Sequence, residues 1–213
     1  MKVMAINGSP RKDWNTATLL KKALEGAASC GAETELVHLY DLDYKGCKSC
    51  FACKLKGGKS YGHCAQRDGI TPVLEKLEKV DALILGSPIY FGTVTGEMRS
   101  FFERAAYPYL VYDAQRSSLF PKKIKTGLIF TLGADENRMR EMLIDRHMML
   151  TEMTAGRLFG SAESLIVTDT YQFDDYSKYV TSHDAAAKAK RREEVFPVDC
   201  QKAFDMGARF AKK

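Results

Sequence analysis

The sequence predicts an α/β protein in which helices cover both faces of one five-stranded parallel β-sheet. Two observations support this. Short, continuously apolar runs, which suit buried strands, alternate along the chain with segments whose apolar residues have helical spacing. The chain has 213 residues, of which 45% are apolar, so it is long enough to bury the core of a single domain over 1–213. With right-handed crossovers, such units form a three-layer sandwich.

Five runs have the composition of buried strands. In chain order they are 2–6, 33–40, 81–87, 125–133 and 163–171. Continuous apolar runs are typical of parallel strands that are buried on both faces. The common order for a parallel sheet of this size is 2-1-3-4-5, so the predicted fold is the flavodoxin-like sandwich.

Five segments between and after these strands have helical periodicity. They are 16–29, 71–80, 95–106, 136 to about 155, and a region from 183 towards the C-terminus that is interrupted near Pro197. Thr71 suits the N-cap of the second helix, and Pro72 suits its first turn. The connections 41–70 and 107–123 are longer than normal, and long loops in compact domains tend to be functional.

Composition and charge exclude several classes of function. No apolar run approaches the roughly 20 residues of a membrane-spanning helix, and the apolar stretch behind Lys2 is too short for a signal peptide. The net charge of +5 is mild, and acids directly follow the basic residues of 188–194, so this stretch is interpreted as a solvated helix face. We therefore expect a cytoplasmic protein with neither a nucleic-acid nor a membrane partner.

The loop after the first strand, GSPRKDWNT at 8–16, has the composition of a phosphate site. It lies at a switch point of the predicted sheet and leads into a helix N-terminus, where free N–H groups and the helix dipole favour an anion. Ser9, Thr16 and Thr18 add hydroxyl donors, and Arg11 adds a fixed charge. The alternative is an ordinary turn in which Thr16 serves only as the N-cap.

The loop after the third strand, within GSPIYFGTVTGEMRSFFER at 86–104, suits a flat ring. Pro88 stiffens the exit from the strand, and Gly92 leaves room for a ring to lie against the backbone. Backbone N–H groups of 90–93 and the hydroxyl of Thr93 suit the nitrogens and carbonyls of such a ring. Two loops of this kind at one switch point are hard to explain as ordinary turns.

The two loops together resemble the NAD(P)H-dependent FMN reductase families of flavodoxin-like fold, and among these the branch of the iron–sulfur flavoproteins. The likeness continues through TLGAD, after the fourth strand, to VFPVDCQKAFDMGARF near the end. It implies an FMN-binding oxidoreductase that NAD(P)H reduces and that passes electrons to flavin, quinone or another small acceptor. It implies that the FMN phosphate is held by Ser9, Pro10, Arg11, Asn15, Thr16 and Thr18. It implies that the isoalloxazine is held by Pro88, Ile89, Tyr90, Phe91, Gly92, Thr93, Thr131, Leu132, Gly133 and Ala134.

Trp14 departs from the family pattern, which commonly has glycine before Asn15. A tryptophan cannot enter a tight loop, so its ring should point outward, over a neighbouring subunit, over the flavin edge or on the surface. A flavin supplies its own redox chemistry, so no catalytic side chain is named. A positive group near the ring, either Arg11 or a lysine from 45–59, would favour the anionic reduced flavin.

Four of the six cysteines lie in one loop, at Cys47, Cys50, Cys53 and Cys64. The C-x2-C-x2-C spacing lets three thiols reach one [4Fe–4S] cluster, and the iron–sulfur flavoproteins carry this triplet at the same place, with the fourth cysteine closer. Three interpretations stay open: a cluster in an electron carrier that a ferredoxin-like redox protein serves, a zinc site in a non-enzymatic binding protein, or free thiols.

Self-association is also expected. The helix predicted at 136–155 carries several methionines, and the loop 107–123 is rich in aromatic residues, which together exceed the apolar surface that one small sheet needs. In the family that the chain resembles, the flavin commonly lies near a subunit interface. We therefore expect a homodimer or a homotetramer.

Overall fold

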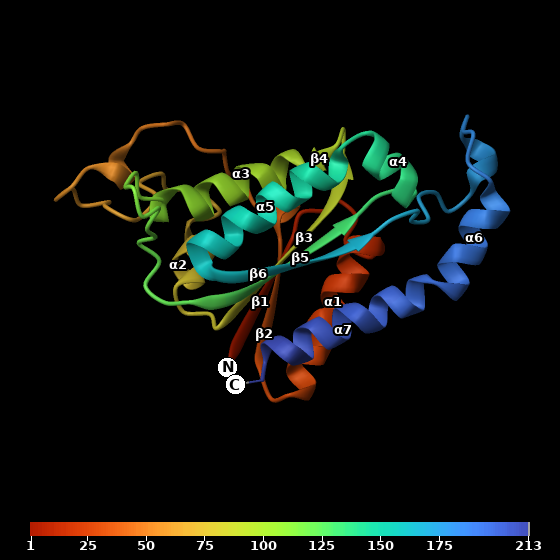
Figure 1. Ribbon diagram of the computed structural model, residues 1–213, viewed down its shortest axis with the longest axis horizontal. Helices are drawn as coiled ribbons and strands as arrows, with labels where there is room; N and C mark the ends of the chain where they lie inside the picture. The colour runs from red at the N-terminus through yellow and green to blue at the C-terminus, as the bar shows by residue number, and fades with distance from the viewer. Residues whose placement is uncertain (213) are drawn as a thin grey trace.

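The computed structural model describes residues 1–212 and contains five parallel strands in one sheet (Figure 1). They are β1 (Lys2–Asn7), β2 (Glu33–His38), β3 (Ala82–Tyr90), β5 (Ile124–Thr131) and β6 (Gly160–Val167). Hydrogen bonds join them in the order β2-β1-β3-β5-β6, while the short β4 (Thr93–Val94) pairs antiparallel with β3. Without β4, this is the predicted order of parallel strands, and the flavodoxin-like fold class is confirmed.

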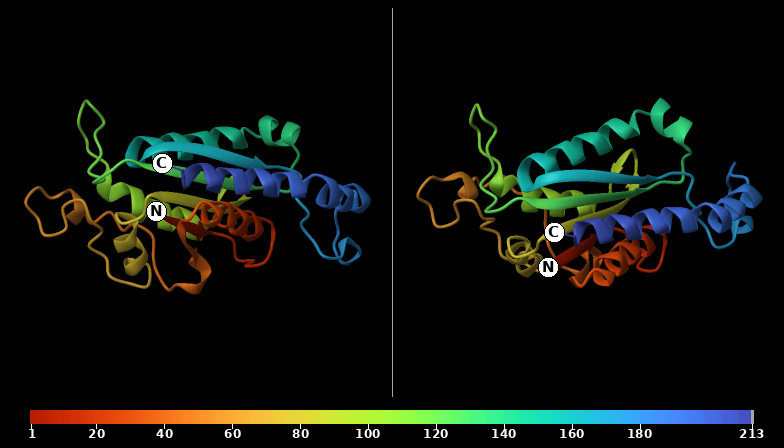
Figure 2. Two further views of the ribbon diagram at one scale, coloured as in Figure 1. Left: turned by 90° about the horizontal axis from the view of Figure 1, so that it is seen from below. Right: turned by 60° about the horizontal axis from the view of Figure 1, so that its bottom comes forward.

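Helices cover both faces of the sheet, as Figure 2 shows from two sides. On one face lie α1 (Asn15–Ser29) and α7 (Phe196–Phe210), and on the other lie α2 (Thr71–Leu77), α3 (Gly96–Ala106) and α5 (Ile144–Phe159). The remaining helices are α4 (Glu136–Glu141), α6 (Ala185–Glu194) and the 3-10 turns Leu39–Asp41, Ala52–Lys54, Tyr107–Tyr109 and Tyr176–Lys178. Within residues 1–212, none of the helices has the length and apolar character needed to cross a membrane.

Two glycines let α1 and α7 pack against each other very closely. A β-carbon at Gly26 would lie 1.9 Å from the carbonyl oxygen of Phe204, and one at Gly207 would lie 1.7 Å from that of Ala23. Any side chain at either position would push the helices apart. The helix α7 is therefore held directly on α1, which follows the first loop. The segment before α7, which includes α6, is held in place with it.

Two predicted helices differ from those of the structure. The helix expected over 136–155 is divided into α4 and α5, because Leu143 adopts a left-handed backbone conformation with a φ of 55°. The helix expected over 71–80 ends at Leu77 and continues as a tighter turn. Its N-cap is Ile70, while the Thr71 hydroxyl accepts a hydrogen bond from the N–H of Asp68 (3.0 Å).

Candidate functional site

The loops after β1 and β3 meet at the carboxyl edge of the sheet. Asn7 and Gly86 are paired at this edge, and the N–H of Gly8 donates to the carbonyl of Gly86 (2.8 Å). The buried hydroxyl of Thr95 donates to the carbonyl of Gly8 (2.7 Å) and accepts from the N–H of Met98 (3.2 Å). Thr95 therefore caps α3 and ties the two loops together with one side chain.

The first loop, residues 8–16, leaves the N-terminus of α1 without a side-chain cap. The N-cap residue is Trp14, whose side chain makes no capping hydrogen bond, so the alternative that Thr16 is the N-cap is wrong. The buried Thr16 hydroxyl instead lies 2.7 Å from that of Thr131, at the end of β5. The N-terminus of a helix that lacks a side-chain cap offers backbone N–H groups of the kind that bind anions.

The polar side chains of the first loop differ in their exposure. Ser9, Asn15 and Thr16 are buried, Thr18 is half-buried, and Pro10 and Arg11 are exposed. The Ser9 hydroxyl accepts a hydrogen bond from the N–H of Arg11 (3.1 Å) and donates one to the carbonyl of Arg11 (3.3 Å), so both of these bonds stay within the loop. The ring nitrogen Nδ1 of His38 lies 2.9 Å from the amide nitrogen of Asn7, so this histidine supports the base of the same loop.

The loop expected over 88–93 is a β-hairpin. β3 continues to Tyr90, β4 begins at Thr93, and the two residues between them, Phe91 and Gly92, have φ angles of 50° and 83°. Two central residues with positive φ are typical of the tight type I′ turn. A β-carbon placed at Gly92 would find no atom closer than 3.9 Å, so the space beside the turn is open.

Residues 131–134 lie beside this hairpin, because Thr131 pairs with Pro88 across the sheet. Their carbonyl groups accept hydrogen bonds from the N–H groups of Asp169 (2.7 Å) and Thr170 (3.0 Å). The ammonium group of Lys188, on α6, donates to the carbonyl of Gly133 (2.6 Å) and forms an ion pair with Asp169. All three predicted loops thus share one edge of the sheet.

Residues 168–179 form a covering segment that lies over the first loop. The sequence does not predict this placement. The carbonyl of Tyr171 accepts hydrogen bonds from Trp14 Nε1 (3.0 Å) and from the side-chain amide of Asn15 (2.8 Å). Arg11 donates to the carbonyl of Gln172 (2.7 Å) and pairs with Asp174 at 3.5 Å. Arg11 is therefore already engaged with this segment.

A local signal for the covering segment exists in its aromatic residues. Tyr171, Phe173, Tyr176 and Tyr179 fall within one short stretch, and their rings pack on one another. The rings of Phe173 and Tyr179 are stacked with centroids 4.0 Å apart. Such density of aromatic residues in a polar stretch indicates a segment that packs on itself rather than a free linker.

Trp14 lies within the chain's own fold. Its ring is 6.4 Å from that of Tyr171, and the guanidinium groups of Arg11 and Arg192 lie 3.8 Å and 5.9 Å from its centroid. Arg192 comes from α6 and donates to the side-chain oxygen of Asn15 (2.6 Å). The tryptophan that replaces the expected glycine thus lies between residues of the first loop, the covering segment and α6.

The interpretation of 188–194 as a solvated face is therefore wrong for three residues. Lys188 is only 5% exposed, and Arg191 and Arg192 are half-buried, whereas Lys190, Glu193 and Glu194 are exposed. Lys188 and Arg192 are four residues apart, so they share one face of α6, and that face is turned towards the predicted site. The lysine that the structure brings to the loops predicted to hold the ring is thus Lys188, outside 45–59.

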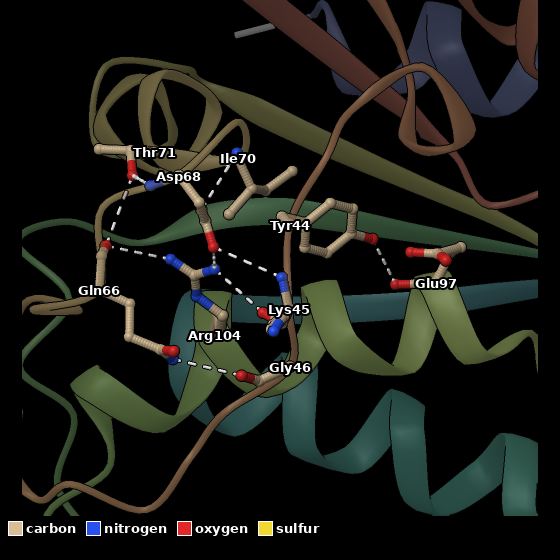
Figure 3. A network of polar contacts seen from close by, with 9 residues as sticks. All are labelled: Tyr44, Lys45, Gly46, Gln66, Asp68, Ile70, Thr71, Glu97 and Arg104. Carbon is tan, nitrogen blue, oxygen red and sulfur yellow. Dashed lines mark hydrogen bonds and ion pairs between the residues drawn. The ribbon is translucent and has the colours of Figure 1, made fainter.

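The cysteine loop, residues 46–65, is held at the far end of α3 by a buried guanidinium (Figure 3). Arg104 donates to the carbonyls of Lys45 (3.0 Å) and Gln66 (3.1 Å) and forms an ion pair with Asp68. Burial alone would raise the pKa of Asp68, but Arg104 and nearby N–H groups hold it below its usual 3.8. Arg104, which anchors the cysteine loop, and Thr95, which contacts the first loop, lie at opposite ends of α3. The length of the helix therefore separates them by about 15 Å.

The four thiols do not form a metal site in this arrangement. Within residues 1–212, no three His, Cys, Asp or Glu side chains are grouped so that they could hold a metal ion. Cys53 is buried on a 3-10 turn while Cys50 is exposed, and the ammonium of Lys54 anchors that turn to the carbonyls of 107–110. The predicted ligand set Cys47, Cys50, Cys53 and Cys64 is thus not gathered around one point in the described residues, and the [4Fe–4S] cluster and the zinc site both stay predictions.

Comparison with known proteins places this chain in a family. Residues 1–162 match the model of NADPH-dependent FMN reductases. An iron–sulfur flavoprotein of Archaeoglobus fulgidus is 41% identical over 128 residues, 60% of this chain and 60% of that protein. One of Methanocaldococcus jannaschii is 34% identical over 146 residues, 68% of this chain and 69% of that protein.

The similarity of fold extends over nearly the whole chain. The structure of an NAD(P)H:quinone oxidoreductase from Methanothermobacter marburgensis matches with a TM-score of 0.70 over 98% of both chains, at 15% identity. At this low identity the TM-score shows a shared fold and nothing more. The match to the family model, in contrast, includes the first loop, the hairpin and residues 131–134. This chain therefore belongs to the NADPH-dependent FMN reductase family.

Proposed function

We propose that this protein is a flavoprotein oxidoreductase that binds FMN, takes hydride from NADPH or NADH, and passes electrons to flavin, quinone or another small acceptor. One observation carries the proposal: the uncapped N-terminus of α1 lies beside an open hairpin turn at the switch point of the sheet. Family membership supports it, and so does the shared fold with a protein named NAD(P)H:quinone oxidoreductase.

The residues at this edge fit the two ends of FMN. The first-turn N–H groups of α1 and the hydroxyl of Ser9 suit the phosphate, while the hairpin and residues 131–134 suit the ring. FMN supplies the hydride and electron chemistry when it is bound, so the chain's own residues bind and orient it. The half-exposed backbone at Gly92 lets a flat ring approach without a side chain in between, whereas the Gln172 side chain lies beside Gly133.

Comparing two flavins tests this proposal. We expect FMN to bind roughly ten- to a hundredfold more tightly than riboflavin, because charge-assisted phosphate contacts contribute on the order of 1.5–3 kcal/mol. Quenching of flavin fluorescence during titration measures both affinities, and NADPH oxidation in the presence of excess FMN or quinone then measures turnover. Equal affinities for the two flavins would contradict the phosphate assignment.

The names of the relatives favour a second candidate function, an electron carrier with a [4Fe–4S] cluster that a ferredoxin-like protein serves. The four thiols are not gathered around one point in the described residues, so no step is derived through a cluster. Metal analysis of protein made anaerobically with iron distinguishes the candidates. About four irons per chain, lost in Cys50→Ala, would support the carrier. Iron-free protein with four alkylatable thiols would leave an FMN reductase.

We further propose that the protein works in the cytoplasm as a homo-oligomer. All six cysteines are free, which suits a reducing compartment. Several apolar side chains of α5 are exposed, which suits contact with a second copy.

A further inference from the structure

Arg192 lies at the N-terminus of α1, although it comes from a part of the chain beyond the family model's match at 1–162. Its Nη1 donates to Asn15 Oδ1 (2.6 Å), and its guanidinium lies 4.1 Å from the ring centroid of Phe196. Because α7 is packed tightly on α1 through two glycines, the end of α6 that carries Arg192 is held in place. This arginine is therefore a fixed neighbour of the first loop.

The charge of Arg192 has no carboxylate partner within the described residues. The two nearby arginines both have one: Arg191 pairs with Asp199 at 2.7 Å, and Arg11 pairs with Asp174 at 3.5 Å. Burial lowers the pKa of Arg192, Cys200 acts against this shift, and Arg191 adds to it. A half-buried cation without a counter-ion is costly, and a bound anion would offset that cost.

Two other side-chain donors near the N-terminus of α1 are already engaged. The amide nitrogen of Asn15 donates to the carbonyl of Tyr171, and Arg11 donates to the carbonyl of Gln172. A guanidinium has five N–H donors in a planar fork, and Arg192 uses one on Asn15. Arg192 thus combines spare donors with an uncompensated charge beside the uncapped helix N-terminus.

We propose that Arg192 binds the phosphate of FMN and supplies the positive charge that makes the site select a phosphate monoester. The assignment rests on the proposed function, because it takes FMN as the ligand at this edge of the sheet. It also gives Trp14 a role as a positioning residue, since the indole packs beside the Arg192 guanidinium. Phosphate recognition then involves both the first loop and α6.

A purely structural role predicts a different pattern of binding. If Arg192 only braced Asn15, its loss would loosen the first loop and weaken FMN and riboflavin alike. If it binds phosphate, its loss would weaken FMN alone, because riboflavin carries no phosphate. The ratio of the two dissociation constants is therefore the informative quantity.

The test compares four full-length proteins by flavin fluorescence titration: the wild type, Arg192→Gln, Arg192→Lys and Lys190→Ala. Arg192→Gln removes the charge and keeps an amide donor, and Arg192→Lys keeps the charge. Lys190 is exposed on the same helix, so Lys190→Ala is the matched control for the loss of one positive charge. Circular dichroism confirms that each variant is folded.

We expect Arg192→Gln to raise the Kd for FMN roughly ten- to a hundredfold and to leave the Kd for riboflavin within about twofold. Arg192→Lys should recover a large part of the FMN affinity, and Lys190→Ala should match the wild type. An unchanged preference for FMN in Arg192→Gln, whether the two affinities fall equally or not at all, would overturn the assignment of Arg192. The proposed function would still stand. A wild type that binds neither flavin would instead overturn the proposed function, and this assignment with it.

Discussion

At the scale of single residues, Thr95 connects two loops and one helix through a single side chain. One hydroxyl caps α3 and bonds the carbonyl of Gly8, so it joins the two loops whose meeting defines the site. Gly8 adds a steric requirement, since a β-carbon there would lie 2.7 Å from that of Met98. The two residues together keep the first loop against the start of α3.

We expect Thr95→Val to lower the free energy of unfolding of the cofactor-free protein by about 2–4 kcal/mol. A lost N-cap costs about 1 kcal/mol, and a buried carbonyl left without its partner costs about 1–3 kcal/mol. Urea denaturation followed by circular dichroism measures the change. Thr93→Val, at an exposed position in β4, is the matched control and should alter stability by less than about 0.5 kcal/mol. Similar losses in both variants would contradict the role of Thr95.

At the scale of elements, α3 connects two distinct regions. Its N-terminus is joined to the first loop by Thr95, and its C-terminal half fixes both arms of the cysteine loop through Arg104. The side chain of Arg104 is fully buried, and its Nε has no hydrogen-bond partner. Replacement of Arg104 would therefore free the cysteine loop first.

We expect Arg104→Met to increase the rate of tryptic cleavage within the cysteine loop at least about tenfold, because it leaves Asp68 and two carbonyls without their cation. Limited proteolysis with mass spectrometry identifies the cleavage sites, and circular dichroism shows whether the sheet remains folded. Arg99→Met, which removes an exposed arginine of the same helix, should cleave like the wild type. An unchanged rate in Arg104→Met would show that other contacts hold the loop.

The elements also show which parts of the fold and the site the sequence is able to predict. Apolar strands such as 2–6 and 81–87 predict a parallel sheet, and its topology alone brings the loops after them together. The hairpin at Phe91 and Gly92 escapes prediction, because this pair lacks the Asn-Gly or Asp-Gly pattern of type I′ turns. The covering segment escapes prediction because the hydrogen bond from Trp14 to Tyr171 that holds it spans 157 positions. No local sequence pattern encodes a contact over that distance.

At the scale of the whole molecule, α5 and the turn before it carry an exposed apolar surface. Met142, Leu143, Met149, Leu150 and Met153 are each 49% to 62% exposed. Apolar side chains scattered singly over a surface are ordinary, but neighbouring ones on one helix mark a contact surface. A second copy of the chain is the partner that we propose for this surface.

Light scattering at micromolar concentration should therefore report a dimer or a tetramer. We expect Met153→Lys to shift the population towards monomer, because a lysine ammonium in an apolar contact must be desolvated. Val198→Lys, which changes a 52% exposed residue on α7, should leave the assembly intact. A wild type that is monomeric over this range would contradict the assembly.

The long-range bonds of Asn15 have a consequence for the synthesis of the protein. Its partners Tyr171 and Arg192 follow it by 156 and 177 positions, so they leave the ribosome long after the first loop has emerged. A nascent chain that already displays Ser9 and Asn15 still lacks the residues that cover them. Under the proposed function, FMN therefore meets a complete site only after Tyr171 and Arg192 have been synthesised, and a translation product that stops before Tyr171 would carry an open, incomplete site.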